Sequence, residues 1–193
     1  MQPLPLGLPL EAKRERLHIL RGLLEDLAEL PPGEREERIK GDTLWKEGIV
    51  HYELGEYGEA RRCYEEALSL FEKLGEEGRV AGVLHQLGML AQHIGDYAEA
   101  RRLYQQSLKI AEELRDKSGI ASSIGQLGQL AELEGDYATA VRLWATALRI
   151  FEELGSPNAE IVRGWFARLR DELGEERFRE VLAKAQGEGS VNE

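Results

Sequence analysis

The sequence predicts an all-α fold in which pairs of helices repeat along the chain. Gly55, Gly95 and Gly135 follow one another at an interval of 40 residues, which indicates an internal repeat. Within each repeat the apolar residues recur at the spacing of amphipathic helices. The composition, with 21 glycines, 6 prolines and 7% aromatic residues, favours many short helices joined by glycine turns over a sheet.

Two elements are expected at the N-terminal end. Residues 1–9 form an extended leader rich in proline and leucine. Residues 10–30 form an amphipathic helix that stops before Pro31. Because Leu20 lies 40 positions before Ala60, this helix is interpreted as a lone second helix that caps the first repeat.

Three full repeats follow, inside a solenoid region of residues 34–186. They span about residues 41–80, 81–120 and 121–160, and each contains two helices. The recurring positions are Gly48, Gly88 and Gly128; Ala60, Ala100 and Ala140; and the aromatic residues Tyr64, Tyr104 and Trp144. The small residues allow the helices to approach closely, and the aromatic residue fills the space between them.

The turns of the repeats carry helix-capping signals. Gly95 is expected to take the left-handed conformation after a first helix, and Asp96 with Glu99 forms a capping box for the second. Glu56, at the place of Asp96 in the first repeat, is a poorer cap. The second helices are expected to end near Gly75, Ser118-Gly119 and Gly155-Ser156-Pro157.

A degenerate helix pair, at about residues 161–186, is expected after the third repeat. Its helices run over residues 159–173 and 175–185, carry apolar residues such as Trp165 and lack the glycine and tyrosine signature. The pair is interpreted as the C-terminal cap of the repeat stack. Residues 187–193 are expected to form a flexible tail.

These motifs resemble the tetratricopeptide repeat, in particular Leu87-Gly88, the GDYAEA of residues 95–100 and the pair Tyr104 and Ser107. The usual unit of that family has about 34 residues, and this 40-residue unit is similar to the long-helix subclass of LGN-type adaptors and bacterial repeat proteins. The resemblance implies a right-handed α-α superhelical solenoid of three helix pairs with N- and C-terminal capping helices. It weakens in the first repeat, where Glu47 and His51 stand at the positions of Leu87 and Ala91.

Length, charge and cysteine content restrict the class of protein. The 193 residues fit one soluble domain or one short solenoid, and the net charge of −11 disfavours nucleic acid and anionic membranes, which need clustered Lys and Arg. The single cysteine, Cys63, forms neither an internal disulfide nor a cysteine-based zinc site. No secretory signal is recognised, and no run approaches the roughly 20 apolar residues of a membrane span. We therefore expect a soluble, cytoplasmic protein.

The sequence contains no recognisable catalytic motif. A phosphate-binding loop, HExxH, GxSxG and a calcium loop are all missing, so we expect no enzyme activity, no cofactor, no metal ligands and no small-molecule substrate. Cys63 aligns with Leu103 and is interpreted as a small buried hydrophobe, with a reactive or metal-bound thiol as the alternative. Arg62 and Arg102 are expected to pair with acids on exposed helix faces rather than with phosphate.

The resemblance implies that the first helices line a concave groove that binds a peptide. The expected groove residues are Trp45, Ile49, Tyr52, His85, Gln86, Met89, Gln92, Gln126 and Gln129. Apolar residues of the first repeat would anchor a side chain, and the glutamine amides would hydrogen-bond to a peptide backbone. In the alternative interpretation, the capping helix covers Trp45, Ile49 and Tyr52. Whether the leader occupies this groove stays open.

The expected function is a non-catalytic scaffold that binds a peptide or helix of a partner protein. The alternative is a regulatory subunit that completes a composite enzyme or a nucleic-acid-binding assembly. Asp42, Glu53 and Glu132 on the groove face argue against phosphate. No cation stands at the positions that would hold the carboxylate of a chaperone tail, namely Trp45, Ile49, Gln86, Ser122 and Gln126. Self-association and the identity of the partner are left open.

Overall fold

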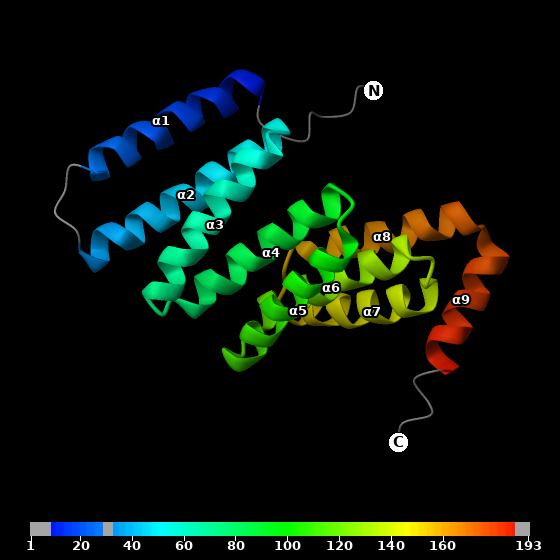
Figure 1. Ribbon diagram of the computed structural model, residues 1–193. Coiled ribbons are helices and arrows are strands. Elements are labelled where there is room, and N and C mark those ends of the chain that lie inside the picture. The colour runs from blue at the N-terminus through cyan, green and yellow to red at the C-terminus, as the bar shows by residue number, and fades with distance from the viewer. Residues whose placement is uncertain (1–8, 29–32, 188–193) are drawn as a thin grey trace. The chain divides into compact units, whose positions relative to one another are not determined.

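The computed structural model describes residues 9–28 and 33–187, and the regular secondary structure in these ranges is entirely helical (Figure 1). The helices are α1 (Leu10–Ala28), α2 (Glu34–Leu54), α3 (Tyr57–Lys73), α4 (Glu77–His93), α5 (Tyr97–Glu113), α6 (Lys117–Leu133), α7 (Tyr137–Glu153), α8 (Asn158–Leu173) and α9 (Glu175–Gly187). The all-α prediction is confirmed. The chain divides within α4 into unit 1, which ends at Leu90, and unit 2, which begins at Ala91.

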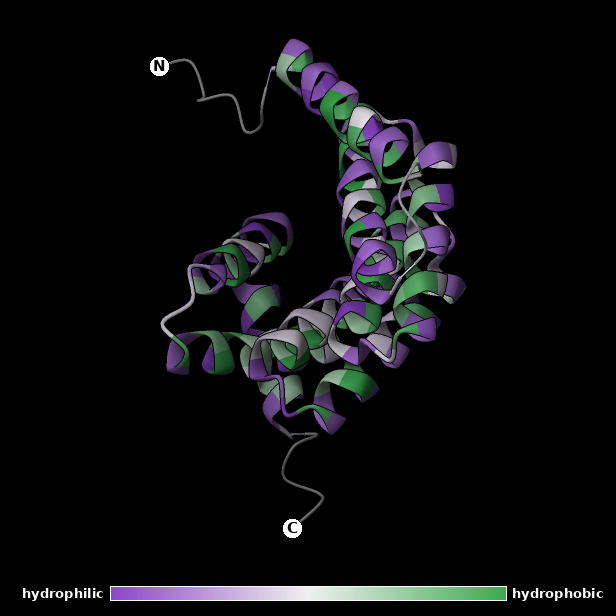
Figure 2. Ribbon diagram, turned by 90° about the vertical axis from the view of Figure 1, so that its left-hand side faces the viewer, coloured by the Kyte–Doolittle hydropathy of each residue, from purple (hydrophilic) through white to green (hydrophobic). Residues whose placement is uncertain are grey.

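Every helix carries both hydrophilic and hydrophobic residues, as amphipathic spacing requires (Figure 2). The helices α3, α5 and α7 begin at Tyr57, Tyr97 and Tyr137, so the 40-residue period of the sequence reappears in the helix boundaries. Helix α2 departs from this register, because it already begins at Glu34. Its first turn contains three glutamates, which stabilise a helix N-terminus.

In unit 1, α2 lies beside both α1 and α3 (Figure 1). Leu17 and Leu20 of α1 form a small buried cluster with Val50 of α2. Helix α3 approaches α2 closely at Gly48, where an added Cβ would lie 2.5 Å from the Tyr64 ring. The glycine is therefore required for the contact, as the repeat pattern predicted.

In unit 2, α7 is the central helix and contacts α6, α8 and α9. Trp144 of α7 is fully buried, and its ring packs edge-to-face on Phe166 at 5.6 Å between centroids. An added Cβ at Gly128 of α6 would lie 2.6 Å from the Trp144 ring. The same small-residue and aromatic pair thus builds the core of both units.

The caps follow the predicted chemistry in two of three repeats. Asp96 accepts a hydrogen bond from the Glu99 backbone N–H at 3.1 Å, and Asp136 accepts one from Thr139 at the same distance. Glu56 makes no capping hydrogen bond through its side chain. The expected weakness of this cap is confirmed, and the Glu56 carboxylate is used elsewhere.

One helix end differs from the prediction. Helix α5 ends at Glu113 and not near Ser118-Gly119, because Arg115 takes a left-handed conformation with φ of 55°. Asp116 then caps α6 by accepting from the Ser118 backbone N–H at 3.0 Å. Ser118 and Gly119 therefore belong to the first turn of α6.

The terminal elements agree with the sequence as far as they are described. Helix α1 covers residues 10–28 of the expected capping helix, and α8 and α9 occupy the expected degenerate pair. Gly187 is the last residue of α9 rather than the first of a tail. The leader up to residue 8 and the tail from residue 188 lie outside the described residues.

Candidate functional site

Trp45, Ile49 and Tyr52 share one face of α2 and are all half-buried. The buried contacts of α1 with α2 are made at Val50 and at Glu47, whose carboxylate Arg21 reaches at 3.2 Å, and Lys13 adds an ion pair with Glu53 at the edge. At about 100° per residue, positions 47 and 50 lie on the opposite side of α2 from position 45. The capping helix therefore covers the other side of α2, against the alternative in which it covers the Trp45 face.

Trp45 is nevertheless part of the packing inside unit 1. Its ring stands edge-on to Phe71 of α3, with centroids 6.2 Å apart. It also fills the space above Gly82 of α4, where an added Cβ would lie 2.6 Å from the indole. The indole Nε1 is buried and finds no hydrogen-bond partner in the described part of the chain. Trp45 therefore stabilises the packing of unit 1 as well as belonging to the candidate binding face of α2.

The α4 residues of unit 1 add an uncharged surface. His85, Gln86 and Met89 are half-buried. Burial lowers the pKa of His85 to about 4, so its imidazole is neutral at pH 7. The predicted mixture of imidazole, amide and thioether groups is therefore present on α4 without a formal charge.

In unit 2 the glutamines differ in their hydrogen bonding. Gln92 accepts a hydrogen bond from the Tyr104 hydroxyl at 2.9 Å. Gln126 and Gln129 lie one turn apart on α6, are half-buried, and have no side-chain hydrogen bond to any described residue. Their amides are available to an external partner, whereas the Gln92 carbonyl is already used.

The acidic residues of these faces are neutralised by nearby cations. Asp42 accepts from Arg79 at 2.8 Å, and Glu53 lies 3.6 Å from the Lys13 ammonium. Glu132 pairs with Arg168. Each of the three acids thus has a positive partner within its own unit, and the ion pairs leave the expectation against phosphate untested.

The arginines on the second helices behave as predicted. Arg62 pairs with Glu59 and Glu66, each at 2.9 Å, and Arg102 pairs with Glu99 at 2.7 Å. These are exposed pairs one helical turn apart, each worth a few tenths of a kcal/mol. They form local ion pairs and leave no ladder of free cations for phosphate.

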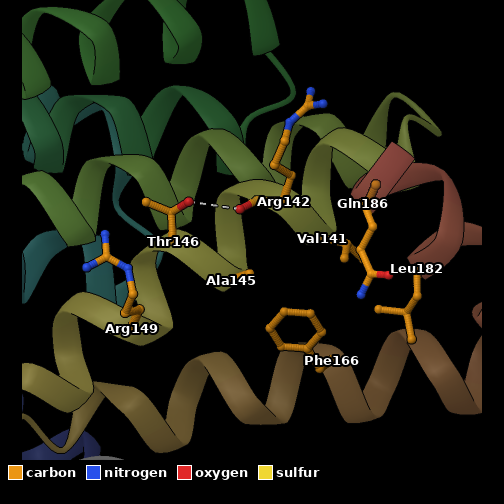
Figure 3. Close-up of a pocket in the computed structure, with 9 residues that line it drawn as sticks. Val141, Arg142, Ala145, Thr146, Arg149, Phe166, Leu182 and Gln186 are labelled. Atoms are coloured by element: carbon orange, nitrogen blue, oxygen red, sulfur yellow. Dashed lines mark hydrogen bonds between the residues drawn. The ribbon is translucent and has the colours of Figure 1, made fainter. Parts of the chain in front are cut away.

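A pocket that the sequence did not predict lies between α7, α8 and α9 in unit 2 (Figure 3). Its volume is about 400 Å³. The lining residues are Val141, Arg142, Ala145, Thr146, Arg149, Phe166, Leu182, Ala185 and Gln186. The two guanidinium groups are engaged, since Arg142 donates to Thr139 and Arg149 pairs with Glu153. The pocket is thus a largely apolar hollow with two arginines in its lining, of which Arg149 is paired with an acid.

Unit 1 contains a second unpredicted feature, a buried polar cluster of Glu47, His51 and Cys63. One ligand-type atom of each side chain lies within 4.8 Å of the other two. Burial, reinforced by the charge of Glu47, raises the pKa of the Cys63 thiol to about 12. Arg21 and Glu56 contact this cluster from its edges.

The repeat register contained a signal for this cluster. Its three members occupy positions that are apolar in the second and third repeats. From the sequence, Glu47 and His51 were interpreted only as departures from the family pattern, and Cys63 as a buried hydrophobe or a reactive or metal-bound thiol. Only the spacing of α2 against α3 brings the three positions together, and periodicity along one helix does not reveal it.

The described residues form helical repeats whose first helices, α2, α4 and α6, carry half-buried polar and apolar side chains. None of the described helices combines the length and the apolar character that crossing a membrane requires.

The chain belongs to the tetratricopeptide repeat family, whose sequence profile matches residues 41–113 and 79–153. Repeats of this family are generally non-catalytic interaction scaffolds, so protein interaction is the general role of this chain. No curated protein sequence matches the chain significantly.

Solved structures show the same fold at low sequence identity. BtubC from P. vanneervenii is 20% identical with a TM-score of 0.74, over 91% of this chain and 70% of that one. Aspartyl phosphate phosphatase F from Bacillus subtilis is 13% identical with a TM-score of 0.69, over 94% of this chain and 50% of the phosphatase. A putative kinesin light chain with TPR-like repeats from Podospora anserina is 17% identical with a TM-score of 0.65, over 91% and 86%. At these identities the likeness concerns the all-α repeat solenoid alone.

Proposed function

We propose that this protein is a scaffold that binds an extended peptide or a helix of a partner protein along the exposed faces of its first helices. The observation that carries the proposal is the burial and the hydrogen bonding of three glutamines. Gln86, Gln126 and Gln129 are half-buried, and their side chains have no hydrogen bond to a described residue. An amide can donate and accept at once, which suits the N–H and C=O groups of a peptide backbone.

The positions of these glutamines support a repeated recognition element. Gln86 and Gln126 are 40 residues apart and therefore occupy the same place in successive repeats. Gln129 follows Gln126 by one turn on the same face of α6. In unit 1, Ile49 and Tyr52 stay half-buried on α2 and offer apolar contact to a side chain of the bound segment.

The charged and titratable side chains of the proposed binding faces also bear on the kind of partner. Asp42, Glu53 and Glu132 are paired with cations inside their own units, and the His85 imidazole is neutral. The faces therefore present amide and apolar groups rather than an array of free charges. A partner segment with uncharged polar and apolar residues fits them better than a highly charged one.

The proposal is tested by selecting peptides from a random library on the folded chain and measuring their affinity by fluorescence anisotropy. The double variant Gln126→Ala and Gln129→Ala should weaken the selected peptides by about tenfold or more, because each lost hydrogen bond is worth about 1 kcal/mol. Gln105→Ala, an exposed position on α5, is the matched control and should bind normally. The helical circular dichroism should be equal in all three chains.

Trp45 is not used in this test, because its ring also packs on Phe71 and Gly82. A Trp45 variant would confuse lost binding with lost packing. A selection that yields no peptide above background would contradict the proposal. Peptides that bind the double variant as tightly as the unchanged chain would contradict it as well.

A further inference from the structure

Three buried positions of the first repeat depart together from the pattern of the other repeats. Glu47, His51 and Cys63 are 3%, 1% and 0% exposed. The matching residues in the second and third repeats are Leu87 and Leu127, Ala91 and Ala131, and Leu103 and Leu143. Each departure replaces an apolar side chain by a metal-ligating one, and the three come from two helices to within 4.8 Å of one another.

The histidine of this cluster is oriented by a carboxylate outside it. His51 Nδ1 lies 2.5 Å from Glu56 Oε2, so a proton on Nδ1 is donated to that carboxylate. The other nitrogen, Nε2, then carries a lone pair and lies 3.5 Å from Glu47 Oε1. A carboxylate that fixes the outer nitrogen of a histidine is the usual support of a metal-ligating imidazole.

We propose that Glu47, His51 and Cys63 bind a divalent transition metal ion of the zinc type. Thiolate, imidazole and carboxylate together suit zinc and its neighbours, whereas calcium and magnesium prefer sites made of oxygen alone. Two ligands at about 2.0–2.2 Å from a tetrahedral zinc lie about 3.4 Å apart, close to the observed spacing of Nε2 and Oε1. Binding releases the Cys63 thiol proton to solvent, and water completes the fourth position.

Arg21 is the cation that neighbours the cluster in the absence of a metal. Its Nε lies 3.2 Å from Glu47 Oε1, and its side chain is 53% exposed. An exposed guanidinium can move into solvent when a metal ion takes over the charge of Glu47. In the bound state a divalent ion offsets the charges of Glu47 and the Cys63 thiolate, while the half-exposed Glu56 keeps its hydrogen bond with His51.

The inference is independent of peptide binding, since none of these residues lies on the proposed binding faces. Its test titrates the chelator-treated chain with Zn²⁺ and with Co²⁺, in the absence of any peptide. We expect one ion per chain, a higher melting temperature with Zn²⁺, and a thiolate-to-cobalt charge-transfer absorption with Co²⁺. Cys63→Ala should remove that absorption and weaken Zn²⁺ binding by at least tenfold.

The other repeats supply a control for folding. The triple variant Glu47→Leu, His51→Ala and Cys63→Leu carries the residues of the second repeat, so it should remain helical and bind no metal. His18→Gln, an exposed histidine on α1, should bind as the unchanged chain does. Arg21→Gln should bind at least as tightly, because it removes a cation that competes for Glu47.

Two results would overturn the assignment. One is a Co²⁺ spectrum that shows the hydrated ion alone, which would leave the cluster as a structural contact between His51 and its two carboxylates. The other is metal binding that persists with the same stoichiometry and affinity in the triple variant. Loss of binding in Arg21→Gln would likewise contradict the role given to Glu47.

Discussion

Arg115 holds a backbone conformation that glycine holds at the matching positions of the neighbouring repeats. Its φ is 55°, against 66° for Gly75 and 61° for Gly155. A left-handed conformation costs a residue with a Cβ about 1–2 kcal/mol, and glycine avoids most of that cost. The turn between α5 and α6 therefore contains local strain that the other two turns lack.

Arg115→Gly should raise the free energy of unfolding by about 1 kcal/mol, which urea denaturation followed by circular dichroism can measure. Arg115→Ala keeps the Cβ and removes only the charge, so it is the matched control and should change stability little. An unchanged or lower stability in Arg115→Gly would show that the turn is not strained.

The same residue explains why the sequence misplaced a helix end. Glycine marks the turns at Gly75 and Gly155, so the next glycine along the chain, Gly119, was taken as the corresponding signal. Arginine carries no such signal, because residues with a Cβ rarely take the left-handed conformation that Arg115 has here. A repeat register applied strictly would have placed the end near residue 115.

At the scale of the helix pair, stability depends on a glycine that faces a buried aromatic ring. Gly48 faces Tyr64 in unit 1, and Gly128 faces Trp144 in unit 2. Both rings are 0% exposed, so neither can move into solvent when space is lost. The two contacts show why the repeat keeps a small residue and a large one at these positions.

Gly128→Ala should destabilise the chain by about 1–3 kcal/mol, because the new Cβ would lie 2.6 Å from the Trp144 ring. Gly164→Ala is the control, since α8 has open space around this position. That variant should be more stable by about 0.5–1 kcal/mol, as alanine is the better helix former. Thermal or urea unfolding measures both, and equal effects of the two substitutions would contradict the close contact.

The sequence predicted helix boundaries best where a glycine turn and a capping residue coincided with the 40-residue period. The starts of α5 and α7 have both a glycine turn and an aspartate cap, and the sequence located them. The predicted solenoid region begins at residue 34, where α2 starts, although the register of α4 and α6 alone would start α2 at residue 37. The pocket between α7, α8 and α9 was missed, since the degenerate pair lacks the signature from which packing was inferred.

For the whole chain, the fold and the chemistry of the faces are specified by different residues. Solved structures of 13–20% identity share the fold with TM-scores of 0.65–0.74. In this chain the glycine, alanine and aromatic positions of the interior are the ones that recur with the repeat. The half-buried glutamines and the polar cluster in unit 1 lie outside that interior pattern, so the proposed partner binding and the proposed metal binding rest on other side chains than those that build the repeat.

The division into two units predicts that stability is lost locally. Repeat proteins are stabilised mainly by contacts between neighbouring elements, so a defect in one unit leaves distant elements folded. Trp144→Ala removes the largest buried side chain of unit 2 and should cost about 3–5 kcal/mol there. Amide hydrogen exchange should then show lost protection in α6, α7 and α8, while α1 and α2 keep most of theirs.

Tyr64→Ala is the reciprocal experiment and should expose α2 and α3 first. Equal loss of protection in all described helices, with either variant, would mean that the chain unfolds as a single cooperative body.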